Sequence, residues 1–271
     1  MTSSNIEDIV YRTVDGADLA GRLYRPDGGG TGTWLIDVHG GAWGSGDRLN
    51  NEVIHLDLQA NGVGTFALDF RLSDVAPYPA PVEDVAYGVR WFKTNADRLD
   101  LSVKTLGALA SSSGAQQMGL IALRPDDPRW AVKDAALGNA DASVEFLVAG
   151  WPILDPLARY RMVQEAGNER IMGAHHAYFA DEAAMADGNP YMLLERGEAT
   201  HLPPVLIVQG TNDANVAHER ADMFAALYRE KGGAAEVIKY EGMPHTFVTN
   251  EPDAELSQKA IADIRAFVLG R

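Results

Sequence analysis

Short apolar runs alternate with helical patterns along most of the chain. Six such runs, each about the length of a strand, end in loops rich in glycine or polar residues. They cover residues 34–38, 64–69, 106–110, 144–149, 205–208 and 237–240. Between several of them, apolar side chains recur close to the spacing of one helix face, at residues 82–95, 217–231 and 256–269. Strands that alternate with helices predict an α/β fold, in which a mostly parallel, twisted sheet has helices on both faces.

Two parts of the chain depart from this alternation. At the start, residues 9–13 and 19–24 flank an Asp-Gly turn, which predicts an antiparallel hairpin at one edge of the sheet. Residues 151–203 instead mix aromatic residues and methionines with many charges. A segment of this length is too long for a plain loop, so we expect a small helical insertion that caps one end of the sheet. The length fits a single domain, residues 1–271, that includes this insertion.

The composition narrows the kinds of partner. Hydrophobic residues make up 46% and charged residues 23% of the chain, as in ordinary globular proteins. The net charge of −15 argues against nucleic acid, because nucleic-acid binding needs a basic face. The chain has no cysteine, which excludes disulfides, thiolate metal sites and a cysteine nucleophile. The N-terminal stretch lacks a signal-peptide pattern and no apolar run approaches the ~20 residues of a membrane span, so we expect a cytoplasmic protein without a membrane partner.

A serine stands where the apolar run at residues 106–110 ends. Ser112 has the small residues Ala110 and Gly114 two positions away on either side. A small-x-Ser-x-Gly element between a buried strand and a helix is typical of the nucleophile elbow, a tight and strained turn whose neighbours must be small. Alanine replaces the usual first glycine here.

The two adjacent serines leave the register of this turn open. Ser111 would place Leu109 at a crowded position, which fits poorly. Ser113 would have Ser111 and Ala115 there, which are small but include no glycine. Ser112 fits best. A serine-rich turn between strand and helix is as often structural as catalytic, so the motif needs partners elsewhere in the chain.

A glycine-rich loop follows the first apolar run. It begins with His39, Gly40, Gly41, Ala42 and Trp43. Consecutive glycines directly after a strand let backbone N–H groups converge on one point, which the stabilisation of an oxyanion in acyl transfer requires. Glycines alone would also fit a loop that only needs flexibility, but the histidine, the small residue and the aromatic residue beside them make the pattern more specific.

Five ordered motifs resemble those of the α/β-hydrolase superfamily, and within it the hormone-sensitive-lipase-like carboxylesterases and their acetyl-esterase-like and feruloyl-esterase-like relatives. The motifs are His-Gly-Gly-Ala-Trp at 39–43, Asp-Phe-Arg-Leu at 69–72 with Pro-Tyr-Pro-Ala-Pro-Val-Glu-Asp at 77–84, the Ser112 turn, Gly-Thr-Asn-Asp at 210–213 and Gly-Met-Pro-His-Thr-Phe at 242–247. The resemblance runs from about residue 20 to the end of the chain and implies the α/β-hydrolase fold.

The resemblance also implies the groups that stabilise the oxyanion. They carry over as the backbone N–H groups of Gly41, Ala42 and Ser113. Ser-Gly-Ala at 113–115 stands where relatives usually have Ala-Gly-Gly, a change that bears on specificity more than on activity. Because few residues precede the first predicted strand, we expect the N-terminal cap helices of many hormone-sensitive-lipase-like enzymes to be missing and the 151–203 insertion to provide most of the cover.

A serine nucleophile needs a histidine to take its proton. In the superfamily the order along the chain is serine, acid, histidine. His245 lies in the loop directly after the last apolar run, where this histidine is expected. His218 begins a predicted helix and His201 lies in a proline-rich loop, so structural roles suit both of them better.

The histidine in turn needs a carboxylate that fixes its tautomer. Asp213 follows the apolar run at 205–208 and therefore lies at the C-terminal end of a strand, beside the expected elbow. Its alternative role is that of a turn residue that caps the next helix. Asp222 lies on that helix, and Asp155 follows an earlier strand as a turn residue, so both are poorer candidates.

These residues predict a serine hydrolase that works through an acyl-enzyme, and the resemblance implies a carboxylesterase for short- to medium-chain carboxylic esters. Ser112, Asp213 and His245 form the predicted triad, and Trp43 and Trp151 are candidates for the wall of the substrate pocket. Ordinary packing explains either tryptophan equally well. An amidase, formamidase or peptidase would use the same triad, and a non-catalytic binding protein of the same fold is a further alternative.

The expected partner is a small-molecule ester, and we expect no cofactor. His175 and His176 invite a metal interpretation, but adjacent histidines on a helix point apart and no third ligand is evident in the sequence. We therefore expect no metal. The sequence leaves the substrate, the choice between ester and amide, and the formation of a homo-oligomer open.

Overall fold

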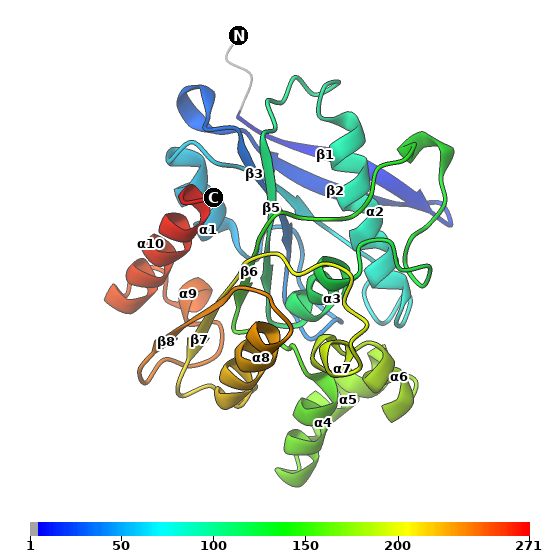
Figure 1. The fold of residues 1–271 in the computed structure, drawn as a ribbon, viewed down its shortest axis with the longest axis vertical. Helices are drawn as coiled ribbons and strands as arrows, with labels where there is room; N and C mark the ends of the chain where they lie inside the picture. The colour runs from blue at the N-terminus through cyan, green and yellow to red at the C-terminus, as the bar shows by residue number, and fades with distance from the viewer. Residues whose placement is uncertain (1–4) are drawn as a thin grey trace.

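The computed structural model describes residues 5–271; the first four residues, at the start of the stretch that lacks a signal-peptide pattern, lie outside the described residues. Within this range, eight strands form one sheet in the order β1-β2-β4-β3-β5-β6-β7-β8 (Figure 1). The β1–β2 and β2–β4 pairs are antiparallel and all other neighbours are parallel. The strands are β1 (Ile6–Val14), β2 (Ala17–Tyr24), β3 (Thr33–Val38), β4 (Gly64–Leu68), β5 (Thr105–Ser111), β6 (Leu147–Gly150), β7 (Val205–Gly210) and β8 (Ala235–Tyr240).

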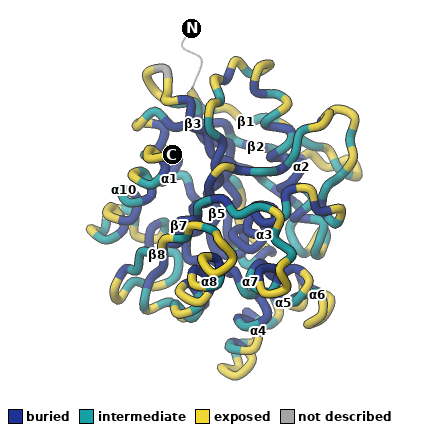
Figure 2. The backbone as a smooth tube through the Cα atoms, viewed as in Figure 1, coloured by how far each residue is buried: buried dark blue, intermediate teal, exposed yellow. Residues whose placement is uncertain are grey.

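The central strands are buried on both faces. Every residue of β3, β4 and β7 is buried, whereas β1 at one edge is partly exposed, as the dark blue and yellow parts of the tube show (Figure 2). A strand covered on both faces is apolar at nearly every position, which is why these strands stood out as continuous apolar runs. The N-terminal hairpin and the mostly parallel sheet are confirmed.

The strand predicted at residues 144–149 begins later than expected. The paired strand β6 covers Leu147–Gly150. Val144 and Phe146 are fully buried core residues, but they belong to the loop that leads into β6. The backbone of this segment already bonds to β5, since the Glu145 N–H donates to the Leu106 carbonyl at 2.8 Å and the Phe146 carbonyl accepts from the Ala108 N–H at 2.9 Å. The apolar run therefore marks where burial and contact with β5 begin, a few residues before the strand itself.

Helices cover both faces of the sheet. The side chains of α1 and α10 pack into one hydrophobic cluster, while those of α2, α3 and α8 pack into another on the opposite face. The predicted helices at 82–95, 217–231 and 256–269 are confirmed, with their ends moved by one or two residues. The helices are α1 (Glu52–Ala60), α2 (Ala80–Asn95), α3 (Ser112–Leu123), α8 (Glu219–Glu230), α9 (Phe247–Asn250) and α10 (Glu255–Leu269), with short 3₁₀ turns η1 (Asp27–Gly29) and η2 (Ala135–Leu137). In residues 5–271 no helix has the length and apolar character needed to cross a membrane.

Four short helices lie between β6 and β7, where the helical insertion was expected. Figure 1 shows them grouped at one end of the molecule, beyond the strands. Each begins with an aspartate or asparagine whose side-chain oxygen accepts a hydrogen bond from a backbone N–H of the first turn. The helices are α4 (Pro156–Glu165), α5 (Glu169–Tyr178), α6 (Glu182–Asp187) and α7 (Pro190–Glu195).

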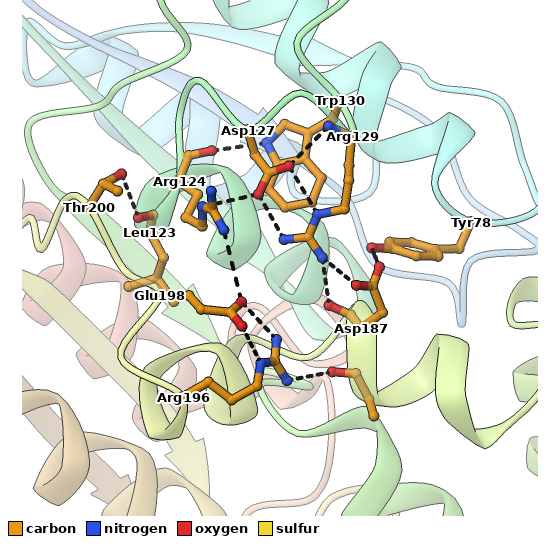
Figure 3. Close-up of polar contacts among 11 residues, drawn as sticks. Tyr78, Leu123, Arg124, Asp127, Arg129, Trp130, Asp187, Arg196, Glu198 and Thr200 are labelled. Carbon is orange, nitrogen blue, oxygen red and sulfur yellow. Dashed lines mark hydrogen bonds and ion pairs between the residues drawn. The ribbon is translucent and has the colours of Figure 1, made fainter.

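A network of ion pairs joins these helices to the loop that follows α3 (Figure 3). Arg129 forms ion pairs with Asp127 in that loop, at 2.8 Å, and with Asp187 at the end of α6, at 2.6 Å. Arg196, directly after α7, pairs with Glu198 at 2.7 Å. The network fixes the far side of the helical segment against the body of the domain, although each partly exposed pair contributes only ~0–1 kcal/mol to stability.

Candidate active site

Ser112 lies at the junction between β5 and α3. Its φ of 49° is in the left-handed region, which non-glycine residues rarely occupy. The turn brings the start of α3 against the end of β3, because a Cβ atom on Gly114 would lie only 2.2 Å from the carbonyl oxygen of Val38. Ala110 on the other side is fully buried. The small residues on both sides of Ser112 therefore sit where larger ones would not fit.

The three consecutive serines make three different contacts. Ser111 Oγ accepts a hydrogen bond from the Gly40 N–H at 3.0 Å, and Ser113 Oγ accepts one from the Trp43 N–H at 3.2 Å. Both outer hydroxyls therefore hold the glycine-rich loop. Ser112 Oγ alone lies within hydrogen-bond distance of a histidine.

That histidine is His245, and it joins the other two predicted residues. Its Nε2 atom lies 2.9 Å from Ser112 Oγ, and its Nδ1 donates to Asp213 Oδ2 at 2.7 Å. With the proton on Nδ1, the Nε2 lone pair is free to accept the serine proton. The structure thus brings Ser112, His245 and Asp213 into one continuous chain of hydrogen bonds.

The surroundings of Asp213 keep its carboxylate ionised. Burial alone raises its pKa, but the hydrogen bond and charge of His245, the Val216 N–H and the Gln209 amide together hold the pKa below its ordinary value. Asp213 Oδ1 also accepts from the N–H groups of Asn215 and Val216, at 2.8 and 2.9 Å. The carboxylate therefore has a fixed orientation toward the imidazole.

A glycine lets the loops that carry Asp213 and His245 approach each other. A Cβ atom on Gly210, at the end of β7, would lie 2.2 Å from the carbonyl oxygen of Met243. The Asn212 N–H donates to that same carbonyl at 3.0 Å. The neighbouring strands β7 and β8 thus deliver the acid and the histidine to the same edge of the sheet.

The predicted oxyanion donors remain available for a ligand. Within the described chain, the N–H groups of Gly41 and Ala42 have no protein acceptor. Ser113 lies in the first turn of α3, where backbone N–H groups have no partner inside the helix. Gly41 and Ala42 have positive φ values of 124° and 51°. Glycine adopts such a value freely, whereas the alanine is held in a conformation that it rarely adopts.

Buried polar residues support this loop from behind. His39 Nδ1 donates to the Gly40 carbonyl at 2.6 Å, and its ring stacks on Phe70 with centroids 4.3 Å apart. Asn51 Nδ2 donates to Asp37 Oδ1 at 2.9 Å and to Ser111 Oγ at 3.1 Å. His39 therefore holds the glycine-rich loop in place. Asn51 was not predicted, because no local pattern distinguishes it from other asparagines in loops.

Ser112 opens on a cavity of about 420 Å³. Gly41, Ala42, His245 and Trp151 also line it. The cavity therefore combines the serine, the histidine and the free N–H groups of the glycine-rich loop in one space that is large enough for a small ligand.

The two tryptophans proposed for the pocket wall have different environments. Trp151 lines the cavity. Trp43 does not: its side chain is only 1% exposed, stacks on Tyr178 at 4.8 Å and donates from Nε1 to Gln116 Oε1 at 2.9 Å. The proposed place of Trp43 in the pocket wall does not fit this packing, because the ring points into the hydrophobic cluster under α5.

The remaining histidines and acids have structural contacts. Asp155 caps α4, and His201 Nδ1 donates to the Ala122 carbonyl at 3.0 Å. His175 and His176 contact Arg159 and a tyrosine hydroxyl, respectively. Among residues 5–271 no group of three or more histidine, aspartate or glutamate side chains is arranged to hold a metal ion.

Comparison with known proteins agrees with this architecture. The family model BD-FAE matches residues 23–227. The probable carboxylic ester hydrolase LipM of Mycobacterium tuberculosis is 24% identical over 246 residues, which is 88% of this chain and 54% of LipM. Carboxylic ester hydrolase LipN of the same organism is 22% identical over 253 residues, or 89% of this chain and 64% of LipN. The chain thus spans between half and two thirds of the length of these relatives.

Solved structures show the same fold. The propionate-bound esterase Est2 of the planctomycete Thermogutta terrifontis superposes with a TM-score of 0.79 at 22% identity, covering 98% of this chain and 94% of Est2. The butyrate-bound form gives a TM-score of 0.80 at 21% identity, with the same coverage of 98% and 94%. The BD-FAE match covers well over half of the chain, including most of the sheet and all four helices between β6 and β7. The chain is therefore an α/β-hydrolase that belongs to the BD-FAE family.

Proposed function

We propose that this protein is a serine esterase that hydrolyses short- to medium-chain carboxylic esters of small molecules through an acyl-enzyme. The observation that carries the proposal is the chain of hydrogen bonds from Asp213 through His245 to Ser112, whose side chain lines the cavity. The similarity to LipM, LipN and Est2, which are described as carboxylic ester hydrolases or esterases, supports the same reaction class.

In the first half of the proposed reaction, Ser112 Oγ attacks the carbonyl carbon of the ester. His245 Nε2 takes the hydroxyl proton as the C–O bond forms. Asp213 stabilises the imidazolium that results, and its fixed carboxylate keeps the ring in the correct orientation. When the tetrahedral intermediate collapses, His245 returns the proton to the departing alcohol and the acyl group stays on Ser112.

The negative charge of the tetrahedral intermediate falls on the former carbonyl oxygen. The N–H groups of Gly41, Ala42 and Ser113 are the proposed donors to it. Removal of one such donor typically lowers kcat by about 10² to 10³. Because the loop conformation is already set by Ser111, Ser113 and His39, the donors need no reorganisation as charge develops.

In the second half, water repeats the sequence. His245 takes a proton from water as its oxygen attacks the acyl-enzyme, and then gives that proton to Ser112 as the carboxylic acid leaves. The volume of the cavity, about 420 Å³, lies at the lower end of the range for small-molecule sites and favours small acyl groups.

The test is the hydrolysis of p-nitrophenyl esters of increasing acyl length by the purified protein and two serine variants. We expect Ser112→Ala to lower kcat by about 10⁶, as removal of the nucleophile does in a serine protease, while the circular dichroism spectrum stays unchanged. Ser113→Ala removes only the acceptor for the Trp43 N–H and should keep most of the activity. A fluorophosphonate probe should label the wild type and not Ser112→Ala.

Full activity of Ser112→Ala would overturn the proposal. If Ser113→Ala were inactive and Ser112→Ala active, the nucleophile would be Ser113. Matched ester and amide substrates test the reaction class, because faster cleavage of the amide would point to an amidase.

A further inference from the structure

The charge of the cavity around Ser112 is opposite to that of the protein. The chain carries 38 acidic and 23 basic residues. Among the described residues that line the cavity, however, there is no aspartate or glutamate, whereas Arg159 and Arg170 both line it. The other polar lining comes from neutral groups, such as Asn50, Asn215 and Thr249. A cavity of this composition attracts anions in a protein that otherwise repels them.

Arg159 is a buried cation without a carboxylate partner. It lies on α4 and is only 5% exposed. Its Nε donates to the Asn215 carbonyl at 3.1 Å and its Nη1 to His175 Nε2 at 3.0 Å, and no carboxylate of the described chain lies within ion-pair distance. His175 is neutral, because burial, followed by the charges of Arg159 and His176, lowers its pKa to about 3. The guanidinium carbon of Arg159 lies 5.8 Å from the centre of the Trp43 ring, which attracts the cation weakly, but no group in contact with Arg159 carries a negative charge.

The free part of the Arg159 guanidinium can donate to a ligand. Its Nη2 makes no hydrogen bond to any described residue. The charge of Asp213 attracts Arg159 from beyond ion-pair distance, but that carboxylate is itself occupied by His245. Burial of an unpaired charge costs several kcal/mol, so a bound anion would satisfy a group that the protein leaves unsatisfied.

Arg170 adds a second positive charge to the same cavity. It lies in the first turn of α5, is exposed, and makes no ion pair with a described residue. Its charge acts on Arg159 and disfavours the protonated form of that guanidinium. By contrast, Arg220, which faces a neighbouring cavity, is paired with Asp155. Two arginines that repel each other without a counter-ion mark a place for an anion.

We propose that the cavity selects esters that carry a carboxylate, which Arg159 binds and Arg170 attracts. The inference rests on the proposed esterase function and specifies its substrate class. Both arginines line the cavity that holds Ser112, so the carboxylate and the ester bond would belong to one molecule. Arginine suits this role because its planar fork matches a carboxylate.

The experiment compares anionic and neutral esters of matched shape. Ethyl hydrogen glutarate against ethyl pentanoate places the carboxylate on the acyl side, and 4-acetoxybenzoate against 4-acetoxybenzamide places it on the alcohol side. For at least one pair we expect kcat/KM to be about tenfold to a hundredfold higher for the anionic ester, the effect of one buried, charged hydrogen bond. The pair that shows the preference identifies the side of the ester bond on which the carboxylate binds.

Variants then separate recognition from a structural role. We expect Arg159→Met to remove the preference through a higher KM for the anionic ester, Arg159→Lys to restore part of it, and Arg170→Gln to reduce it severalfold in a salt-dependent way. Arg161→Gln is the matched control, because Arg161 also lies on α4 but forms an exposed ion pair with Glu182 at 3.0 Å. That variant should leave the ratio of the two kcat/KM values unchanged.

Different failures have different meanings. If the wild type hydrolyses neutral esters but shows no preference in either pair, the proposed selectivity is overturned and the esterase function stands. The same holds if Arg159→Met and Arg170→Gln lower kcat/KM equally for both members of a pair, because that result indicates a structural role. If the wild type hydrolyses none of the four esters, the proposed function itself fails. Should Arg159→Met not fold, Arg159→Lys and Arg170→Gln still decide the outcome.

Discussion

Two regions of the molecule are stabilised in different ways. One is the C-terminal ends of the strands, where Ser112 lies, here called the sheet edge; the other is the group of four helices between β6 and β7. Ser112, Ala42 and Thr246, which lie around the cavity, have φ values of 49°, 51° and 59°. Such conformations cost about 1–3 kcal/mol each and persist only where surrounding structure imposes them. For Ser112 and Ala42, buried strands impose them, since these residues follow β5 and β3, and neither strand has an exposed residue.

The helices α4 to α7 instead depend on local contacts. All four have a side-chain hydrogen bond at the N-cap, from Asp155, Asn168, Asp181 and Asn189. None of α1, α2, α3, α8 and α10, which pack on the sheet, has one. Helices of six to ten residues are marginal by themselves, so caps compensate in α4 to α7 for the burial that the other helices obtain from the sheet.

The difference has a consequence for mutations. A change at the sheet edge disturbs backbone positions that many contacts fix together. We therefore expect a large loss either of kcat or of the free energy of unfolding. Apart from Arg159 and Arg170, a change in α4 to α7 removes one local contact, so its effect should be graded and should fall mainly on stability. Substitutions of the same kind in the two regions test this contrast.

After loss of the nucleophile Ser112 itself, the largest effect is expected for Asp213→Asn at the sheet edge. The asparagine oxygen would keep the hydrogen bonds from the Asn215 and Val216 N–H groups, so its NH₂ group would face His245 Nδ1. That contact favours the wrong imidazole tautomer, and we expect kcat to fall by about 10⁴, as for the same substitution in a serine protease. Ester hydrolysis at neutral pH measures it; a fall of less than tenfold would contradict the role of Asp213.

A pair of glycine substitutions compares the two regions directly. A Cβ atom on Gly114 would lie 2.2 and 2.3 Å from the carbonyl oxygens of Val38 and His39, which are backbone atoms. We expect Gly114→Ala to reduce the free energy of unfolding by about 3 kcal/mol, the upper part of the usual range for overpacking. In α5, a Cβ atom on Gly173 meets nothing within 4 Å, so Gly173→Ala should stabilise the protein by up to about 1 kcal/mol.

Urea unfolding of both variants measures these free energies. The same change, glycine to alanine within a helix, should have opposite signs in α3 and α5. Equal effects would show that the sheet edge is no more tightly constrained than the helical segment.

The contrast also explains what the sequence could predict. Strands buried on both faces leave continuous apolar runs in the sequence. Gly41 in the glycine-rich loop and Gly114 at the start of α3 are glycines because backbone atoms approach them too closely for a side chain. For this reason the sheet, and the convergence of Ser112, Asp213 and His245, could be predicted from local patterns. The roles of these three residues in catalysis stay a prediction.

The wall of the cavity could not be predicted in the same way. Arg159, Arg170 and Asn51 come from separate loops and helices, and no short motif marks any of them. The sequence leaves Trp43 open between the pocket wall and ordinary packing, and in the structure its ring lies in the core under α5, stacked on Tyr178. Tertiary packing, which no local spacing encodes, determines which of these side chains reach the ligand.

A pH dependence of stability is expected from α5. Burial first, and then the charges of Arg159 and His176, lower the pKa of His175 to about 3, against an ordinary value near 6.5. The unfolded chain therefore binds a proton below pH ~6.5 that the folded protein does not, so the stability contributed by the neutral His175 is lost as the pH falls from ~6.5 toward 3. The free energy of unfolding therefore falls by at most about 1.4 kcal/mol for each pH unit in this range.

His175→Gln tests this slope, because glutamine can still accept from Arg159 and does not titrate. Between pH 6.5 and 5, the wild type should lose about 2 kcal/mol more stability than the variant, measured by urea unfolding at each pH. Identical slopes for the two proteins would mean that His175 is protonated in the folded state.

The smallest effect is expected at the N-cap of α6. Asp181 Oδ1 accepts from the Ala184 N–H at 2.8 Å, and the residue is exposed, so its replacement changes little besides the cap. We expect Asp181→Ala to lower the free energy of unfolding by about 1 kcal/mol, and Asp181→Ser, which can also cap, to lower it less. Ester hydrolysis should stay unchanged in both variants, because α6 does not line the Ser112 cavity. A loss of activity without a loss of stability would show that α6 is coupled to the active site, and the two regions would then not be independent.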